Sequence, residues 1–192
     1  MPRPKEFEPD AALDKAMHLF WEKGYAGTSV QDLVDRMGVN RFSMYDTFGD
    51  KHALYLAAIA RYREQVTGQL LAILGEGDGL SAIQNHFRAL AEALGSSMGR
   101  VGCLVQNATL EVAPHDAEVA ARTRAANGAV ADALYDALLR ALGAGADLRR
   151  RAHYLFALSQ GLIAMAKDSD DGEAVRGAAR FIIDEIEGWR RA

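Results

Sequence analysis

The chain has 192 residues, 49% of them hydrophobic and 25% charged, and its formal net charge at pH 7 is −4. This composition is that of a globular protein and excludes an intrinsically disordered chain. One cysteine excludes an internal disulfide, no apolar run reaches the ~20 residues that span a bilayer, and the first residues lack the apolar stretch of a signal peptide, so we expect a cytoplasmic protein.

The predicted fold is all-α. Ala and Leu, which favour helices, are abundant, and three of the four prolines lie in the first nine residues. We expect the first helix to be capped by Asp10 and to end at Gly24, because four apolar residues between them share one helical face. These are Leu13, Ala16, Met17 and Phe20.

Two short helices joined by a tight turn are predicted next. Thr28 or Ser29 caps the first, and Gly38 ends it. Asn40 caps the second, whose sequence is RFSMYDTF. Two helices joined by a glycine-containing turn form a helix-turn-helix, and the N-terminal residues of its second helix lie nearest the bases in the DNA major groove. The spacing therefore predicts a DNA-binding element at about residues 28–47.

The rest of the chain is also predicted to be helical. A long helix runs from about Lys51 to Leu74, and the sequence GEGDG at residues 75–79 breaks it. Segments rich in glycine, or containing Pro114, bound the helices that follow. Their expected ranges are 79–97, 100–113, 115–143, 147–168 and 172–190.

The charge of the N-terminal segment argues against DNA binding. Residues 1–51 contain nine acidic and seven basic side chains, whereas affinity for DNA depends heavily on basic side chains that neutralise phosphates. The assignment to DNA binding therefore depends on the spacing of the helix-turn-helix and on the residues around it.

The sequence from Leu13 to Leu54 resembles the N-terminal domain of the tetracycline-repressor (TetR) family. The resemblance implies an all-helical homodimer, with a three-helix DNA-binding domain at residues 1–50 and a helical ligand-binding and dimerisation domain at residues 51–192. It also implies a repressor that an effector releases from a palindromic operator, although an activator would use the same DNA-binding domain. The matching residues are Ala16, Leu19, Phe20, Gly24, Tyr25, Thr28, Ser29, Val30, Gly38, Val39, Ser43, Tyr45, Phe48, Lys51 and Leu54.

Two residues depart from the pattern of this family. Phe42 stands where many members have Gly, and Asp46 stands where His, Tyr or Ala is common. An acidic side chain repels phosphate, but it can accept a hydrogen bond from the amino group of cytosine. These two departures therefore leave the base sequence of the operator undetermined.

The predicted DNA-binding residues surround the turn and the second short helix. Arg41 and Ser43 are assigned to bases and Met44 to a thymine methyl group, whereas Asn40 caps the helix. The remaining members are assigned to phosphates. The full set is Thr28, Ser29, Asn40, Arg41, Ser43, Met44, Tyr45 and Lys51.

Several of these residues have a structural alternative. Thr28 and Ser29 are also suitable as simple helix caps, Tyr45 as a packing residue and Lys51 as a solvated side chain. Two basic residues near the N-terminus are assigned to an arm that lies near the minor groove or the DNA backbone. They are Arg3 and Lys5.

The segment around Cys103 resembles a second pattern, GCL-x-x-N-x-x-x-E, found in one branch of the TetR family. Some members of that branch respond to electrophiles or oxidants through this cysteine. We expect Cys103 in the first turn of its helix and three residues after Arg100, and both features would lower the pKa of a thiol. The alternative is a small buried apolar residue. The matching residues are Gly102, Cys103, Leu104, Asn107 and Glu111.

A small-molecule pocket is expected between helices of the C-terminal domain. Ordinary core packing is the alternative for its apolar members. No cofactor or metal is expected, because no two histidines are spaced i, i+4 and there is no second cysteine, although His86, His115 and His153 could meet in a pocket. The predicted ligand or sensor residues are Phe87, Leu90, Cys103, Gln106, Asn107, Tyr154 and Leu158.

The last two predicted helices have broad apolar faces and small residues that permit close approach. The family resemblance implies that they form a four-helix dimer interface, and two-fold symmetry would match a palindromic operator. The alternative is that they form core within one chain. The residues on the two faces are Leu155, Leu158, Leu162 and Met165, and Ala178, Phe181, Ile182 and Ile186.

An enzyme and a helical adaptor are the two rival classes of function. The chain has no GxSxG, P-loop or HExxH motif and no obvious pair of carboxylates, so an enzyme is not expected. A helical adaptor that binds other proteins would use the same amphipathic helices without binding duplex DNA.

Overall fold

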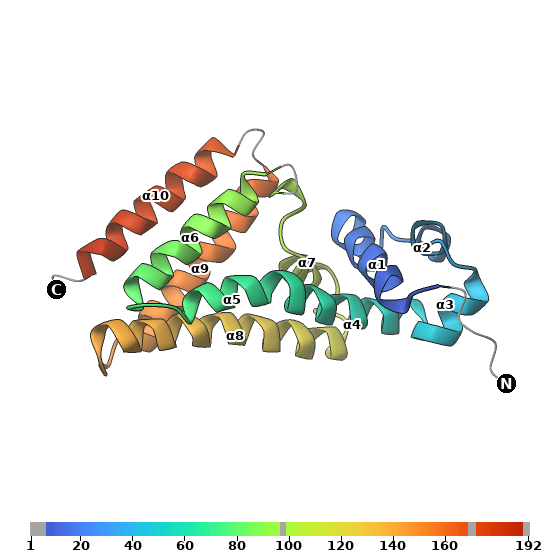
Figure 1. The fold of residues 1–192 in the computed structure, drawn as a ribbon, viewed down its shortest axis with the longest axis horizontal. Coiled ribbons are helices and arrows are strands. Elements are labelled where there is room, and N and C mark those ends of the chain that lie inside the picture. Colours follow the sequence, from blue (N-terminus) through green and yellow to red (C-terminus); the bar gives the residue numbers. More distant parts are fainter. Residues whose placement is uncertain (1–6, 97–98, 169–171, 190–192) are drawn as a thin grey trace. The chain divides into compact units, whose positions relative to one another are not determined.

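The structure, a computed structural model, describes residues 7–96, 99–168 and 172–189, which form helices and no strand (Figure 1). The all-α prediction is confirmed. The chain divides into two compact units. Unit 1 combines the residues up to Gln65 with Leu104–Arg124, and unit 2 combines Val66–Cys103 with the residues from Ala125 onward. Unit 1 is therefore discontinuous in sequence and larger than residues 1–50, and the functional division at residue 50 stays a prediction.

Unit 1 contains the helices that precede the π-helical turn Arg63–Thr67, together with α7 and the start of α8. α1 packs against α2 and α4, α3 packs against α2 and α4, and α7 packs against α1 and α4. The helices are α1 (Pro9–Lys23), α2 (Val30–Met37), α3 (Arg41–Phe48), α4 (Lys51–Tyr62), α7 (Leu104–Glu111) and α8 (Ala117–Leu142).

Most of the predicted helix ends in unit 1 are found in the structure. Ser29 caps α2, Asn40 caps α3, and the Asp50 carboxylate accepts a hydrogen bond from the Ala53 amide at the start of α4. The predicted cap of α1 is wrong, because α1 begins at Pro9 and Asp10 lies within its first turn. Proline suits the first helical position because the amide that it lacks would have no partner there.

The core of unit 1 is aromatic and aliphatic. Phe20 of α1 and Tyr55 of α4 are fully buried, with ring centroids 4.9 Å apart in an edge-to-face arrangement. Leu33 of α2, Met44 of α3 and Leu54 of α4 are also fully buried. Each of the first four helices therefore contributes large side chains to one shared interior.

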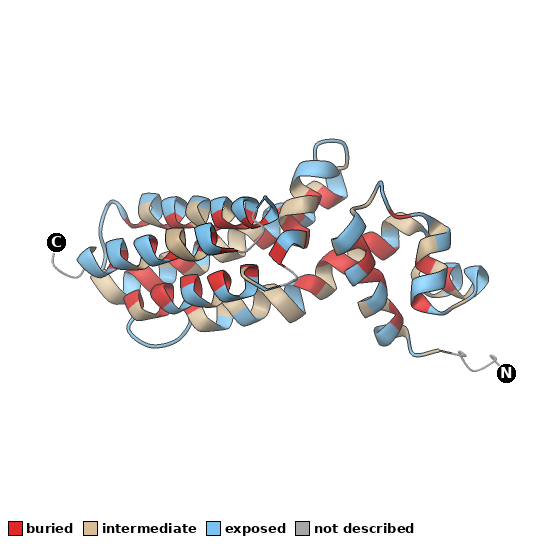
Figure 2. Ribbon diagram, turned by 90° about the horizontal axis from the view of Figure 1, so that it is seen from above, coloured by how far each residue is buried: buried red, intermediate tan, exposed pale blue. Residues whose placement is uncertain are grey.

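Unit 2 is a bundle in which α6 packs against α5, α9 and α10. Its core includes Phe87 of α6, Leu134 of α8, Leu155 of α9 and Val175 of α10, all fully buried. Figure 2 shows buried residues recurring along one face of these helices, as amphipathic helices require. The helices that lie wholly in unit 2 are α5 (Gly68–Leu74), α6 (Leu80–Leu94), α9 (Leu148–Lys167) and α10 (Glu173–Gly188).

Two predicted helices differ from the structure. The helix expected from Lys51 to Leu74 changes to π-helical hydrogen bonding over Arg63–Thr67, where the β-branched residues and Gly68 are weak helix formers. The helix expected at 100–113 begins at Leu104, because Gly102 has a φ of +74° and ends the preceding 3-10 turn. None of the helices in the described ranges is long and apolar enough to cross a membrane.

Candidate nucleic-acid interface

The start of α2 is held by a capping box that α1 reinforces. The Ser29 hydroxyl accepts a hydrogen bond from the Asp32 amide (3.0 Å), and the Asp32 carboxylate accepts one from the Ser29 amide (2.9 Å). Lys23 pairs with this carboxylate at 2.8 Å, and Lys23 and Ser29 together hold the pKa of Asp32 well below its usual range. This polar network ties the start of α2 to the end of α1.

The turn between α2 and α3 has the geometry that its sequence predicts. Gly38 has a φ of +73°, in the left-handed region that favours glycine, and Val39 is half-buried. The side-chain oxygen of Asn40 accepts a hydrogen bond from the Ser43 amide at 2.8 Å. α3 then packs on α2 and α4 with Met44 buried. These elements form the predicted helix-turn-helix.

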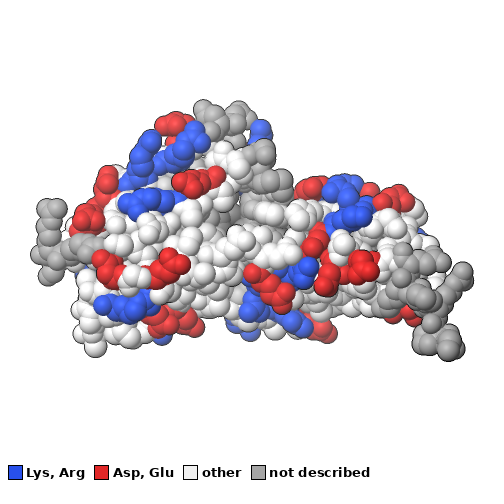
Figure 3. All heavy atoms as spheres, viewed as in Figure 1, with Lys and Arg blue, Asp and Glu red and all other residues white. Residues whose placement is uncertain are grey.

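The outward face of α3 carries Arg41, Phe42, Tyr45 and Asp46, which are all exposed, while Ser43 is half-buried. Arg41 is the one basic residue of the α3 sequence, and it makes no ion pair within the described ranges. In Figure 3, acidic and basic side chains are interspersed over the face that is drawn. The face of α3 thus combines one available cation with aromatic and acidic groups.

Other cations of unit 1 are engaged with neighbouring carboxylates. Arg36 pairs with Glu22 at 2.8 Å, and Arg61 pairs with Asp14 at 2.7 Å. The hydrogen bond from Arg61 also lowers the pKa of Asp14. Each pair cancels one basic and one acidic charge, so the net charge of the segment is unchanged, and Arg41 stays outside these pairs.

Two predicted DNA contacts are corrected by the structure. Met44 is 0% exposed, so its side chain belongs to the core and does not reach a thymine methyl group. Thr28 is also 0% exposed, and its hydroxyl donates a hydrogen bond to the carbonyl oxygen of Gly24 at 2.6 Å. Thr28 therefore stabilises the connection between α1 and α2, and its hydroxyl is not available to a phosphate.

The other predicted phosphate contacts lie at or near the surface. Ser29 and Tyr45 are exposed, and Tyr45 is 42% exposed. Lys51 is half-buried, with its amino group 4.2 Å from the centroid of the Tyr25 ring, so it is not simply a solvated side chain. Burial lowers the pKa of Lys51, and the Glu111 carboxylate acts in the opposite direction. Arg3 and Lys5 lie outside the described residues.

Glu111, at the end of α7, binds the backbone of the α1–α2 connection. Its carboxylate oxygens accept hydrogen bonds from the amides of Tyr25 (3.0 Å) and Ala26 (2.7 Å). A Cβ added at Gly24 would lie 2.8 Å from this carboxylate, so glycine leaves room for it. The sequence identifies Glu111 only as the last residue of a motif, and nothing local in the sequence points to a partner 85 residues away.

A second long-range contact joins α4 to the start of α8. The His52 Nε2 atom lies 2.7 Å from an Asp116 carboxylate oxygen, and the other oxygen accepts hydrogen bonds from the amides of Glu118 and Val119. The hydrogen bond from Val119 is the main reason that the pKa of Asp116 is lowered, with a further contribution from His52. We call the contacts of Glu111 and Asp116 the α7–α8 clamp.

The predicted sensor residues are divided between the two units. Phe87 and Leu90 are buried in the core of unit 2, and Leu158 packs against it partly buried. Tyr154 is 44% exposed and its hydroxyl donates to the Glu185 carboxylate at 3.2 Å, so it does not face the core. The remaining two polar members are half-buried on α7 in unit 1. They are Gln106 and Asn107.

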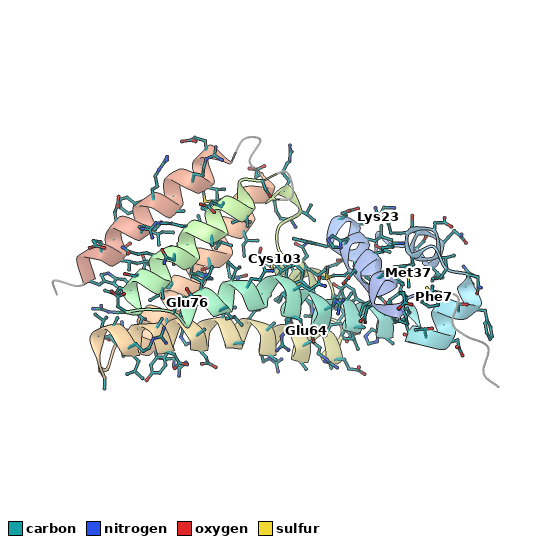
Figure 4. The ribbon with its side chains drawn as sticks, in the orientation of Figure 1. Phe7, Lys23, Met37, Glu64, Glu76 and Cys103 are labelled. Atoms are coloured by element: carbon teal, nitrogen blue, oxygen red, sulfur yellow. The ribbon has the colours of Figure 1, made fainter. Side chains whose placement is uncertain are left out.

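Cys103, labelled in Figure 4, lies immediately before α7 and not in its first turn. It is partly buried and packs against the core of unit 2. The structure therefore corrects its expected position. The chain passes from unit 2 to unit 1 between Cys103 and Leu104.

The three histidines that could share a pocket differ in burial and are divided between the two units. His86 is buried, with Nδ1 3.4 Å from the carbonyl oxygen of Leu70 and Nε2 without a hydrogen-bond partner, and burial lowers the pKa of His86 to about 4. His115 and His153 are exposed. Within the described ranges, no group of His, Cys, Asp and Glu side chains is arranged to hold a metal ion.

The apolar faces predicted for the last two helices are mostly interior. On α9, Leu155 and Leu162 are buried, and on α10, Ile182 and Ile186 are buried in the same core. Met165 (40% exposed) and Phe181 (73% exposed) instead face outward. The predicted helical periodicity matches the buried positions, but the buried face of each helix packs against other helices of the same chain.

Comparison with known proteins agrees with this architecture. Residues 12–58 match the model of bacterial regulatory proteins of the tetR family, and residues 79–181 match the model of the LmrA/YxaF-like transcriptional regulator C-terminal domain. The uncharacterised HTH-type transcriptional regulator YezE of Bacillus subtilis is 34% identical over 89% of this chain and 92% of its own length. The HTH-type transcriptional repressor ComR of Escherichia coli is 31% identical over 86% of this chain and 82% of its own length.

A solved structure with a similar fold contains DNA. It is a cysteine mutant of the TetR family transcriptional regulator CifR complexed with 26-base-pair operator DNA, and it superimposes with a TM-score of 0.86 at 26% identity, over 95% of this chain and 98% of its own. The family models span both parts of the chain, and the α2–turn–α3 geometry is that of a helix-turn-helix. The chain therefore belongs to the tetR family of bacterial transcriptional regulators, with an LmrA/YxaF-like C-terminal domain.

Proposed function

We propose that this regulator is a repressor that binds a palindromic operator as a homodimer and is released by an effector of its C-terminal unit. The observation that carries the proposal is Arg41, an exposed cation without an ion-pair partner in the described ranges, in the first turn of a capped recognition helix. Arginine binds the O6 and N7 atoms of guanine with two hydrogen bonds, which is the commonest specific contact in the major groove. CifR in complex with operator DNA supports the same docking mode.

The groups around Arg41 suit contacts with the DNA backbone. Tyr45 is exposed on the same helix. Ser29 is exposed at the start of α2, but its hydroxyl donates to the Asp32 carboxylate and would have to exchange that partner for a phosphate. Helix starts present amides to phosphates, so α2 and α4 can orient the protein on the duplex. Because Lys23, Arg36 and Arg61 are paired with carboxylates, we expect these three cations to add little to the salt dependence of DNA binding.

Dimerisation is proposed through an exposed stripe on α9 and α10. On α9, Tyr154, Gly161 and Met165 are exposed on one helical face, and on α10 the exposed Phe181 follows the half-buried Gly177. A Cβ added at Gly161 or Gly177 would meet no atom of the described chain within 4 Å. This open space permits a partner helix to approach closely. Two recognition helices related by a two-fold axis would then lie about 34 Å apart.

Effector release is proposed to act through unit 2. The resemblance of the Cys103 segment to one branch of the family suggests a thiol-reactive or small-molecule effector. Cys103 packs against the unit 2 core at the point where the chain enters unit 1. An effector releases DNA only if it binds the non-binding state more tightly than the binding state. Phe87, Leu90 and Leu158 supply the apolar surroundings for such a site.

The proposal is tested by selecting bound duplexes from a random DNA pool with ligand-stripped, reduced protein. We expect a palindrome, and we expect Arg41→Ala to weaken binding to it at least about tenfold without changing the oligomeric state. Arg88→Ala is the matched control, since Arg88 is exposed on α6, outside the proposed dimer helices, and makes no ion pair within the described ranges. Equal operator affinity of Arg41→Ala and wild type would show that Arg41 is wrongly assigned. Failure to recover any sequence above background would contradict DNA binding.

A further inference from the structure

We infer that Phe42 reads a thymine of the operator through its methyl group, an inference that rests on the proposed function. Phe42 is 79% exposed although it is a large apolar residue. It is the second residue of α3 and lies beside Arg41. A single exposed apolar side chain needs no explanation on an ordinary surface, but this one lies in the turn of the recognition helix that comes nearest the bases.

The helical period places Phe42 in the middle of the reading face. At about 100° per residue, the exposed side chains of α3 follow one another around the helix axis in the order Arg41, Tyr45, Phe42 and Asp46, over an arc of about 140°. Phe42 and Tyr45 are therefore the two central members of this arc. Met44 is buried on the opposite side of the helix. The apolar contact with a base is therefore assigned to Phe42 and not to Met44.

The chemistry of the major groove identifies what Phe42 would contact. The C5 methyl group of thymine is the one apolar group that a base pair presents there, and phenylalanine is among the side chains that pack against it. A phenylalanine ring has no donor or acceptor, so it gains nothing from the polar edges of guanine, cytosine or adenine. Covering the ring with a thymine methyl group removes apolar surface of both partners from water.

The test replaces each thymine of the selected operator with deoxyuridine, which removes only the methyl group. At one symmetry-related pair of positions, we expect wild-type affinity to fall about fourfold for each methyl group removed, the effect of one buried methylene-sized group. Phe42→Ala should bind the thymine operator more weakly and should lose nothing further when those two positions carry uracil. Its melting temperature should stay within about 2 °C of wild type, because the side chain is exposed.

Leu110→Ala is the control, because Leu110 is 73% exposed but lies on α7. It should retain the full response to uracil. The inference is wrong if uracil weakens wild type and Phe42→Ala equally at every position, or if no position responds in wild type. In either case Arg41-dependent recovery of a palindrome would leave the proposed function standing, whereas absence of any selected sequence would overturn both.

Discussion

At the scale of single residues, α3 shows why the sequence could place a helix but not all of its contacts. Phe42, Met44, Tyr45 and Phe48 are all large and apolar or aromatic, and on the helix they spread over an arc of about 160° that also contains Arg41. Periodicity alone therefore could not decide which of them is buried. The structure buries Met44 and exposes Phe42, because α3 packs with both α2 and α4. The Asn40 cap was predictable because capping is a local property, whereas the contact of Arg41 with DNA stays a prediction.

His86 is a residue whose surroundings predict a pH-dependent stability. Burial lowers the pKa of His86 to about 4 in the folded protein, whereas an unfolded histidine titrates near ~6.5. Because the unfolded chain binds this proton more tightly, protonation favours the unfolded chain. The folded protein therefore keeps its full stability above about pH 6.5 and loses stability as the pH falls towards 4. We expect the free energy of unfolding to fall by about 2 kcal/mol between pH 7 and pH 5.

Urea denaturation at several pH values measures this effect. In His86→Gln the pH-dependent loss over the same interval should largely disappear, whatever the stability of that variant at pH 7. His153→Gln, which changes an exposed histidine of α9, should keep the wild-type slope. An unchanged slope in His86→Gln would assign the proton uptake to another group.

At the scale of helices, the ends were predicted well where a single residue determines them. Gly38, Gly49 and Gly24 end α2, α3 and α1, each with a positive φ. The start of α7 was missed because the apolar run through residues 101–105 looked helical, although Gly102 interrupts it. The long-range contacts of the α7–α8 clamp could not be predicted, since they join residues 64 to 86 positions apart.

The clamp leads to a prediction about α7. Glu111→Gln removes the negative charge that strengthens the hydrogen bonds from the Tyr25 and Ala26 amides, and it leaves only one acceptor oxygen. We expect hydrogen exchange of these two amides to become about tenfold faster, as local opening becomes easier. Glu118→Gln on α8 is the control. Unchanged protection of both amides in Glu111→Gln would show that the carboxylate does not stabilise the connection between α1 and α2.

At the scale of the whole molecule, the dimer proposal depends on which apolar residues the chain leaves uncovered. Phe181→Glu places a charge in the exposed stripe, and we expect it to convert the dimer to a monomer and to weaken operator binding at least about tenfold. Sedimentation velocity measures the first effect. Leu110→Glu is matched to it, since Leu110 and Phe181 are both 73% exposed. A Phe181→Glu protein that sediments as a dimer would place the interface elsewhere.

Unit 1 is assembled from two separate stretches of chain, residues up to Gln65 and Leu104–Arg124. During synthesis the four N-terminal helices emerge first, and Glu111 and Asp116 follow only after α5 and α6 have been made. The DNA-binding unit therefore reaches its complete form late, through contacts of high sequence separation, which slow folding. A fragment that ends at residue 50 or 65 would lack the α7–α8 clamp. A chimeric regulator that takes its DNA-binding unit from this protein therefore needs residues 104–124 as well.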